Sequence, residues 1–440
     1  MHILKICVIL YCIIFKEMFK MIPALIAFGV TYVLLLTFQK FRPYIAIASA
    51  VVFSVMCGFN LGDVWSAIDW NVLMMIAGTM GTVYLFIESK MPDRLADIII
   101  DKVPNVKWAI VWLSLFAGII SAFVDNVATV LMIAPVALDI SKKLKINPVP
   151  MIIAIAVSSN LQGAATLVGD TTSILLGGAL DMTFLDFFWY DGMPGLFWVV
   201  QAGAVASAII LMWLFRKEKQ PIESHSKTVV SDYFPTVLLL GTIVLLIIAS
   251  FIPNKPAETN GYICIALMII GILRELIFKK NKSIVKNVFK EIDFFTLGLL
   301  AGLFVVIAGI EDRGVITAIS SLFLKLGNNP FLIYTVIVWA SVLFSAFIDN
   351  IPYVATMLPV VMSMSDKLGM EPTLLCFGLL VGATLGGNLT PIGASANITG
   401  IGILRGEGHE VKTGDFMRIG IPFTLCAVLC GYILVWLFWC

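Results

Sequence analysis

The sequence predicts an all-α polytopic membrane protein, with about 10–11 transmembrane helices in two inverted five-helix repeats. Its composition is 60% hydrophobic and only 13% charged, and the mean hydropathy is +1.00. Soluble domains carry about 25% charged residues. One motif also occurs twice, as SAFVDNVATVLMIAPV at 121–136 and as SAFIDNIPYVATMLPV at 345–360. Each repeat is expected to contain a re-entrant hairpin and a discontinuous helix.

The offset of 224 residues between the two motifs also relates residues far outside them. The related pairs are Asp69 and Asp293, Gly78 and Gly302, Lys143 and Lys367, Pro148 and Pro372, Gly163 and Gly387, Thr166 and Thr390, and Gly169 and Gly393. A register without gaps over such a length indicates an internal duplication. In an apolar chain, this pattern is typical of a secondary transporter with its site at the repeat interface.

Apolar runs of about 20 residues are long enough to cross a bilayer. In the first half we expect helices near 22–38, 41–58, 69–87, 150–180 and 195–215. In the second half we expect them near 235–252, 260–278, 294–310, 373–403 and 420–439. This gives a first repeat over 21–215, a linker over 216–232 and a second repeat over 233–440. Residues 1–20 are an N-terminal extension or one further helix at 3–15, with Met21 as an alternative start.

Two apolar segments, 107–142 and 330–365, carry Asp-Asn at their centres, where such residues are costly in hydrocarbon. We therefore predict re-entrant hairpins, with Asp125-Asn126 at one tip and Asp349-Asn350 at the other. The segments 150–180 and 373–403 are rich in Gly, Thr, Ser and Asn at mid-span. These residues break a helix and cap a new one, so we predict discontinuous helices whose second halves begin near Ser173 and Asn397.

Charge asymmetry predicts how the chain is oriented in the cell membrane. Most Lys and Arg residues fall on one predicted side, which the positive-inside rule makes cytoplasmic. The loop 181–194 on the other side carries three aspartates and no basic residue. The linker 216–232 is then cytoplasmic and the C-terminus lies outside. The first hairpin enters from the cytoplasm and the second from outside.

The two hairpin tips are the strongest functional signal. Carboxylate and amide oxygens suit a hard cation such as Na⁺, so Asp125, Asn126, Asp349 and Asn350 are candidate Na⁺ ligands. A buried Asp also carries a proton readily. The alternative is an Asp that only caps a helix and organises the hairpin.

The helix breaks supply the other candidate ligands. Half-helix N-termini attract anions, and free carbonyls attract cations. The candidate ion- and substrate-binding residues outside the tips are Thr129, Gly163, Thr166, Gly169, Asp170, Thr171, Thr172, Ser173, Gly387, Asn388, Thr390, Gly393, Ser395 and Asn397. They would place the solute near the bilayer midplane. The alternative is that Gly and Thr only allow close helix packing. Asp170, whose counterpart is Ala394, is either a coupling carboxylate or a helix cap.

Other chemistries find little support in the sequence. The eight cysteines form no CxxC pair, and the three histidines lie in polar ends or loops. We therefore expect no catalytic residues and no cofactor beyond Na⁺ or H⁺ as coupling ion. A net charge of +1 gives no indication of a nucleic-acid partner. No phosphate-binding GxxxxGK[ST] motif is present, so ATP-driven transport would need an unidentified cytoplasmic ATPase partner.

The tip sequence SAFVDNVATVLMIAPV and the segments GAATLVGDTTSILLGG and GGNLTPIGASANITGIGI resemble the ion transporter superfamily. The similarity is to the branch with arsenite permeases, the P protein and D-type sodium/proton antiporters, which have a citrate-transporter-like domain. The resemblance covers residues 22–440 and implies inverted repeats, a scaffold region, a moving transport region and often a homodimer. The carboxylate-transporting branch has Ser-Asn-Thr at its tips, whereas this chain has Asp-Asn.

The leading hypothesis is a secondary active transporter of a small inorganic solute, driven by H⁺ or Na⁺ through alternating access. Arsenite or antimonite efflux and Na⁺/H⁺ exchange are both candidates. A sodium-coupled di- or tricarboxylate or oxyanion symporter is the alternative. A polytopic membrane enzyme would need a catalytic constellation that the spans do not offer, and a channel is less consistent with paired hairpins. The sequence leaves the solute, the stoichiometry and the direction open.

Overall fold

The structure is a computed structural model that describes residues 21–222, 228–324 and 329–440. The predicted helix at 3–15 lies outside these residues. The described chain is almost entirely helical, apart from a two-stranded antiparallel hairpin of β1 (Trp189–Tyr190) and β2 (Met193–Pro194). It divides into two compact units, and each combines segments of both predicted repeats.

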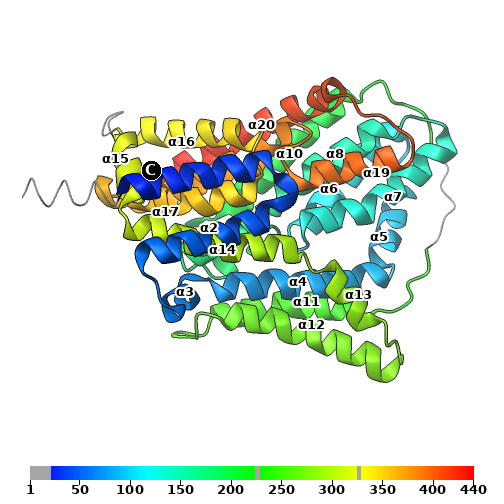
Figure 1. The fold of residues 1–440 in the computed structure, drawn as a ribbon. Helices are drawn as coiled ribbons and strands as arrows, with labels where there is room; N and C mark the ends of the chain where they lie inside the picture. Colours follow the sequence, from blue (N-terminus) through cyan, green and yellow to red (C-terminus); the bar gives the residue numbers. More distant parts are fainter. Residues whose placement is uncertain (1–20, 223–227, 325–328) are drawn as a thin grey trace, which may run out of the picture. The chain divides into compact units, whose positions relative to one another are not determined.

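Unit 1 comprises Met1–Asp69, Phe294–Ile333 and Ala355–Pro372. Its described elements are the helix Met21–Thr37, η1 (Gln39–Phe41), α2 (Arg42–Cys57), α3 (Leu61–Ala67), α14 (Phe294–Asp312) and α15 (Val315–Leu324). It also holds the first residues of α16 (Pro330–Ser345) and most of α17 (Asn350–Leu368). Helices α2 and α14 lie side by side (Figure 1). Gly302 permits this, because a Cβ there would lie 2.6 Å from the backbone of Ala46.

Unit 2 comprises Trp70–Asp293, Tyr334–Val354 and Thr373–Cys440. Its first helices are α4 (Trp70–Glu88), α5 (Met91–Ile100), α6 (Val106–Ser121), α7 (Asn126–Leu144), α8 (Val149–Gly163), α9 (Thr171–Ala179), η2 (Leu185–Phe187) and α10 (Leu196–Leu214). The others are α11 (Phe234–Ser250), α12 (Thr259–Phe278), α13 (Ile284–Glu291), α18 (Thr373–Gly386), η3 (Gly387–Leu389), α19 (Ser395–Gly406) and α20 (Thr413–Trp439). Helix α4 packs along α12 (Figure 1), again through a glycine, since a Cβ on Gly78 would lie 2.4 Å from the backbone of Cys264.

The described helices match the predicted spans. Six are long and apolar enough to cross a membrane, namely Gln39–Cys57, Trp70–Glu88, Leu196–Leu214, Thr259–Phe278, Phe294–Asp312 and Thr413–Trp439. Shorter apolar helices are Met21–Thr37, Val106–Ser121, Val149–Gly163, Phe234–Ser250, Pro330–Ser345 and Thr373–Leu389. The shorter group includes the first arm of each hairpin and the first half of each broken helix. It also includes two of the predicted simple spans, near 22–38 and 235–252.

Each Asp-Asn motif lies at a turn between two helices, as predicted. The first turn separates α6 from α7, and the second separates α16 from α17. Both second arms contain an internal proline, Pro135 in α7 and Pro359 in α17, and these two residues are related by the 224-residue offset. Proline removes a helical hydrogen bond and bends the helix at the same place in each arm.

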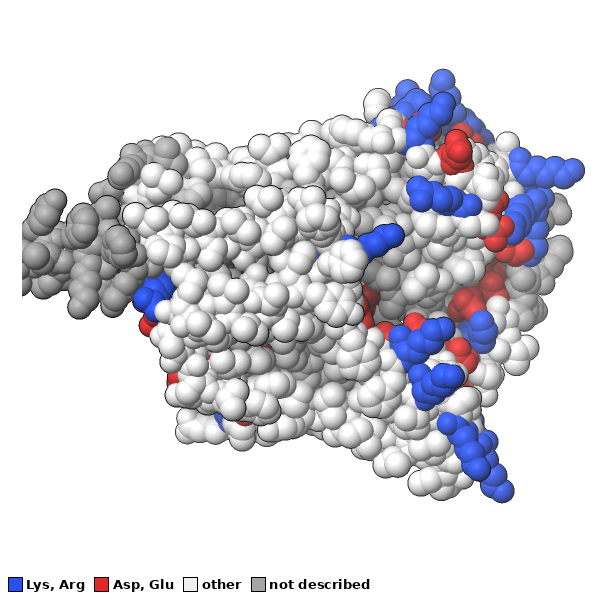
Figure 2. Space-filling view, viewed as in Figure 1, with Lys and Arg blue, Asp and Glu red and all other residues white. Residues whose placement is uncertain are grey.

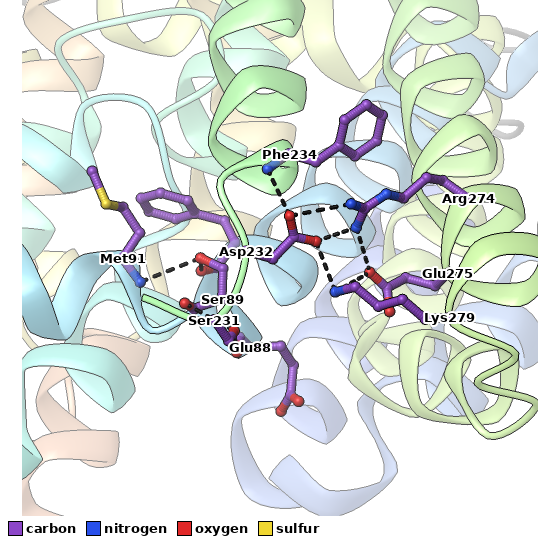
Figure 3. Close-up of polar contacts among 10 residues, drawn as sticks. Glu88, Ser89, Met91, Ser231, Asp232, Phe234, Arg274, Glu275 and Lys279 are labelled. Atoms are coloured by element: carbon purple, nitrogen blue, oxygen red, sulfur yellow. Dashed lines mark hydrogen bonds and ion pairs between the residues drawn. The ribbon is translucent and has the colours of Figure 1, made fainter. Parts of the chain in front are cut away.

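The linker between the repeats crosses several elements of unit 2. The backbone NH groups of Val106 and Lys107 donate to Gln220 and Glu218, and that of Thr228 donates to the Asp97 carboxylate at 2.8 Å. Ser231 then bonds to the carbonyl oxygen of Ser89, at the end of α4 (Figure 3). These bonds attach the linker to α4, α5 and the start of α6.

Asp232, the last residue of the linker, belongs to a cluster of four charged side chains with Arg274, Glu275 and Lys279 (Figure 3). Its carboxylate accepts from Arg274, and from Lys279 at 2.7 Å, while Glu275 accepts from the same two cations at 3.1 and 2.8 Å. Burial disfavours the charged form of Asp232, but the hydrogen bonds from Lys279 and Arg274 outweigh it and lower the pKa to about 2.

Charged side chains gather at the ends of helices rather than along their sides. Figure 2 shows Lys and Arg grouped at the end where α5, α13 and the linker of unit 2 lie. Exposed basic residues of this group include Lys142, Lys143, Lys217, Lys219, Lys279, Lys280, Lys282, Lys286 and Lys290. On the face that Figure 2 shows, largely uncharged helix sides lie between charged helix ends, as contact with lipid requires.

Candidate functional site

The first hairpin tip is held by its own aspartate. Asp125 is the N-cap of α7, and its Oδ1 accepts from the backbone NH groups of Val127 and Ala128 at 3.0 and 3.1 Å. Asn126 follows and is 4% exposed. Its Nδ2 donates to Oδ1 of Asn160 at 3.0 Å, and its carbonyl oxygen accepts from the Ser159 hydroxyl. The tip is therefore anchored to the C-terminal part of α8.

The second hairpin tip repeats the cap but not the anchor. Oδ1 of Asp349 accepts from the backbone NH of Ile351 at 3.2 Å. Asn350 is 3% exposed, and among the described residues its Nδ2 has no hydrogen-bond partner. The position equivalent to Asn160 is Thr384. The second tip thus presents a buried donor that the first tip uses internally.

The first helix break separates α8 from α9. Asp170, 4% exposed, caps α9, with Oδ1 accepting from the Thr171 backbone NH at 2.8 Å and Oδ2 from the Thr172 hydroxyl at 2.9 Å. The capping role predicted as one alternative is therefore present. It also explains why α9 begins at Thr171, two residues earlier than predicted.

The second break lies between α18 and α19. A turn of 3-10 helix, η3, follows α18, and α19 begins at Ser395 without a side-chain cap from Ala394. The Asn397 side chain stabilises this break instead, because its Nδ2 donates to the carbonyl oxygens of Gly387 at 3.2 Å and Thr390 at 3.4 Å. This break is closed by an amide, whereas the first is closed by a carboxylate.

Both breaks attach to the hairpins in the same way. The Thr166 hydroxyl donates to the carbonyl oxygen of Ala122, and the Thr390 hydroxyl donates to that of Ala346. A Cβ on Gly169 would lie 2.5–2.8 Å from the carbonyl oxygens of Gly163, Ala122 and Ser121. A Cβ on Gly393 would lie 2.5–2.9 Å from those of Gly387, Ser345 and Ala346. Only glycine fits at either position.

The two halves meet at Asn160, which the sequence analysis did not select. Its Nδ2 donates to the carbonyl oxygen of Thr384, its own repeat equivalent, at 2.7 Å. It also donates to Oδ1 of Asn388 at 3.1 Å, and Nδ2 of Asn388 donates to the carbonyl oxygen of Val157 at 2.9 Å. The Thr172 and Thr384 hydroxyls lie 3.0 Å apart. The signal in the sequence was weak, because Asn160 lies among other polar residues, Ser158, Ser159 and Gln162, at the end of an apolar helix.

The structure thus brings most of the predicted residues into one part of unit 2. Asp125, Asn126 and Thr129 lie on α7, and Asp349 and Asn350 lie at the second tip. The residues of the two breaks are Gly163, Thr166, Gly169, Asp170, Thr171, Thr172, Ser173, Gly387, Asn388, Thr390, Gly393, Ser395 and Asn397. Ser173 donates to the carbonyl oxygen of Gly163 at 3.3 Å. Thr129 is fully buried, and within the described chain its hydroxyl lacks a hydrogen-bond partner.

The carboxyls of Asp125 and Asp349 both interact electrostatically with that of Asp170. Buried like charges repel, so such a set favours a bound proton or a nearby cation. Within the described ranges, no group of three or more His, Cys, Asp or Glu side chains is arranged to hold a metal ion. A cation here would need mixed carboxylate, amide, hydroxyl and carbonyl oxygens, which suit Na⁺. A cavity of about 640 Å³ in unit 1, between α2, α3 and α14, contains none of the candidate residues.

Comparison with known proteins gives a family and several relatives. The family described as "Citrate transporter" (CitMHS) matches residues 24–373 and 285–439. A 46 kDa membrane protein of Mycobacterium leprae is 29% identical over 432 residues, which are 94% of this chain and 98% of that protein. The P protein of Homo sapiens is 27% identical over 457 residues, which are 86% of this chain and 54% of the P protein. These similarities confirm the resemblance inferred from the hairpin-tip sequence.

A solved structure is similar in fold. The YdaH transporter of Alcanivorax borkumensis, whose topology is described as unusual, aligns with a TM-score of 0.58. The alignment covers 95% of this chain and 97% of that one, with 14% sequence identity. The similarity confirms the predicted all-α fold class.

Proposed function

The chain belongs to the citrate transporter family and is a membrane transporter rather than an enzyme, and from this premise we propose secondary active transport of a small inorganic solute. Transport would be coupled to Na⁺ or H⁺ and would proceed by alternating access. Arsenite or antimonite efflux and Na⁺/H⁺ exchange remain the two candidate reactions.

One observation carries this proposal. Each half contributes a tip with a half-buried aspartate and a buried asparagine, together with a helix break, and each pair is joined by an equivalent Thr-to-carbonyl bond and an equivalent glycine contact. Such an arrangement gathers carboxylate, amide and backbone oxygen atoms in a buried place, which favours a cation or proton over a free anion. The proposed ligands are Asp125, Asn126, Asp349 and Asn350 for the ion, with the break residues for the solute.

The proposal includes an orientation. The Lys and Arg residues at one end of unit 2 support a cytoplasmic linker, and the C-terminus would then lie outside (Figure 2). The bond between Asn160 and its equivalent, Thr384, supports repeats related by an axis close to these residues. We infer inverted repeats in a homodimer that binds the lipid bilayer. A cytoplasmic ATPase partner is a separate hypothesis. Flux by the purified chain without ATP would contradict it.

A sodium-coupled carboxylate or oxyanion symporter is the second candidate. The Nδ2 of Asn350, which has no hydrogen-bond partner in the described part of the chain, favours it, since a buried donor suits an anionic oxygen. The family description also names citrate as a transported solute.

The experiment is a flux screen in proteoliposomes with imposed pH and Na⁺ gradients. The solutes are Na⁺, arsenite, sulfate, phosphate and citrate. We expect gradient-driven flux of one inorganic solute, and its loss in both Asp125→Asn and Asp349→Asn, because these changes keep the shape but remove the charge. Ser114→Ala is the matched control, because among the described residues the Ser114 hydroxyl bonds within its own helix, to the carbonyl oxygen of Ile110.

The outcomes separate the candidates. Flux of citrate with Na⁺ and no flux of inorganic solutes would replace the leading proposal with the second one. Wild-type flux and gradient dependence in both Asn variants would contradict the assignment of the tips.

A further inference from the structure

Four buried asparagines form a continuous chain of side-chain hydrogen bonds in unit 2. Asn126 donates to Asn160 at 3.0 Å, Asn160 donates to Asn388 at 3.1 Å, and Asn397 donates to Asn388 at 3.3 Å. All four side chains belong to residues at most 4% exposed. The chain runs from the first hairpin tip through the C-terminal part of α8 to η3 and the first turn of α19.

Backbone carbonyls fix the direction of every amide in this chain. A carbonyl oxygen can only accept, so Nδ2 of Asn160 must face the carbonyl of Thr384, and its Oδ1 must face Asn126. Likewise, Nδ2 of Asn388 must face Val157, and its Oδ1 then receives both Asn160 and Asn397. No amide in the chain can be flipped without placing two acceptors or two donors against each other.

The fixed direction has a consequence at the first tip. Asn160 presents an acceptor, so Asn126 must turn its NH₂ group inward, and its own Oδ1 is left for a partner outside the chain. An oxygen held in this orientation suits a cation. Asn350 at the second tip has no such support, since the equivalent of Asn160 is Thr384 and Nδ2 of Asn350 is unpartnered among the described residues.

We infer that Asn160 is a positioning residue that orients Asn126 as a cation ligand and links the first hairpin tip to the second helix break. The inference deepens the proposed function and depends on it for the role of Asn126. Because Asn388 holds Asn160, the state of the second break reaches the first tip without direct contact between them. Buried networks of this kind act as one unit.

The test measures flux driven by a Na⁺ gradient and by a pH gradient in proteoliposomes, with Asn160→Leu, Asn388→Leu and the control Ser114→Ala. We expect Asn160→Leu to raise the KM for the driving cation about tenfold, with Vmax changed less than about twofold. Asn388→Leu should raise the same KM, although Asn388 does not contact Asn126. The double variant Asn160→Leu/Asn388→Leu should have a KM no higher than that of the more affected single variant, because the two residues act in series.

Several results would overturn the inference. A lower Vmax with an unchanged KM would mean that Asn160 only supports folding, and additive effects in the double variant would mean that no link exists. If Asn160→Leu does not purify, the smaller change Asn160→Ser should give an intermediate KM, and an unchanged KM there would also refute the inference.

A thermal measurement separates this inference from the proposed function. Asn126→Leu and Asn388→Leu should show non-additive shifts in Tm of the purified full chain, and additive shifts when residue 160 is Leu. If wild-type protein shows no gradient-driven flux, the proposed function fails, and this cycle still decides whether the chain of amides couples its ends. Additive shifts with Asn160 present would refute the coupling.

Discussion

The two helix breaks share a backbone arrangement but differ in the group that closes them. In the first break, the Asp170 carboxylate caps α9 through Thr171 and Thr172. In the second, Ala394 cannot cap α19, and the Asn397 amide bonds to the carbonyls of the break instead. The duplicated backbone therefore defines a pair of equivalent sites, while the side chains make one site acidic and leave the other neutral. The first break therefore adds a carboxylate to the two that the tips carry, and the second break adds none.

Asp170→Asn should have the largest effect, because it removes the charge by which the two breaks differ. Asn caps helices about as well as Asp, so α9 should survive, while the charge that distinguishes the two breaks is lost. We expect gradient-driven accumulation to fall at least about 100-fold, with little change in Tm. Accumulation in proteoliposomes and Tm of the same preparation are the measurements. If the Asp170→Asn variant accumulates solute as the wild type does, Asp170 serves only as the N-cap of α9.

Gly169→Ala and Gly393→Ala test what the two breaks share. Each new Cβ would meet three backbone carbonyl oxygens at 2.5–2.9 Å, and backbone cannot move away as a side-chain end can. We expect each variant to lose roughly 1–3 kcal/mol of stability, seen as a lower Tm. Gly402→Ala in α19, where no atom lies within 4 Å of the added Cβ, is the control and should not lower Tm. A shift in only one of the two variants would show that the breaks are not equivalent.

Asn126→Leu and Asn350→Leu sharpen the difference between the tips. The first leaves the Oδ1 acceptor of Asn160 without its partner, which costs about 1–3 kcal/mol in a buried site. The second removes an amide whose Nδ2 has no partner among the described residues, so its stability cost should be smaller. Thermal unfolding without solute measures both. Equal destabilisation by the two changes would argue against the asymmetry of the tips.

Asp232→Asn probes the linker and should have the smallest effect. Its ion pairs are partly buried, so we expect a loss of about 1 kcal/mol, at the upper end of the range for exposed pairs. Because the folded pKa is lowered from 3.8 to about 2, this stabilisation is present above about pH 4 and is lost as the pH falls toward 2. The difference in Tm between wild type and variant should narrow over that range. Asp191→Asn, in the exposed turn between β1 and β2, should show no such narrowing.

The sequence predicted the elements of the site better than their connections. The doubled Asp-Asn motif located both tips, and the Gly-rich segments located both breaks, because these signals are local. The starts of α9 and α19 were placed two residues late, since Asp170 and the turn before Ser395 begin each half-helix earlier. Asn160 was missed because its partner, Thr384, is 224 residues away and the bond uses a backbone carbonyl that no side-chain pattern reveals.

The division into two units could not be predicted from local sequence patterns either. Helices α4 and α14 are repeat equivalents, yet one packs on α12 and the other on α2, so each pairs with a helix from the opposite repeat. Gly78 and Gly302 make both contacts close. The sequence shows that these glycines correspond but not which surface each one meets.

The bonds between breaks and hairpins limit the kinds of motion open to unit 2. The Thr166 hydroxyl and the Gly169 backbone hold the end of α6 against the first break, and Thr390 and Gly393 do the same for α16. A hairpin that swung open alone would have to break these contacts and expose carbonyls in a dry environment. Each hairpin is therefore fixed to its helix break and is not expected to open by itself. Under the proposed alternating access, each hairpin and its broken helix would have to move together as one piece.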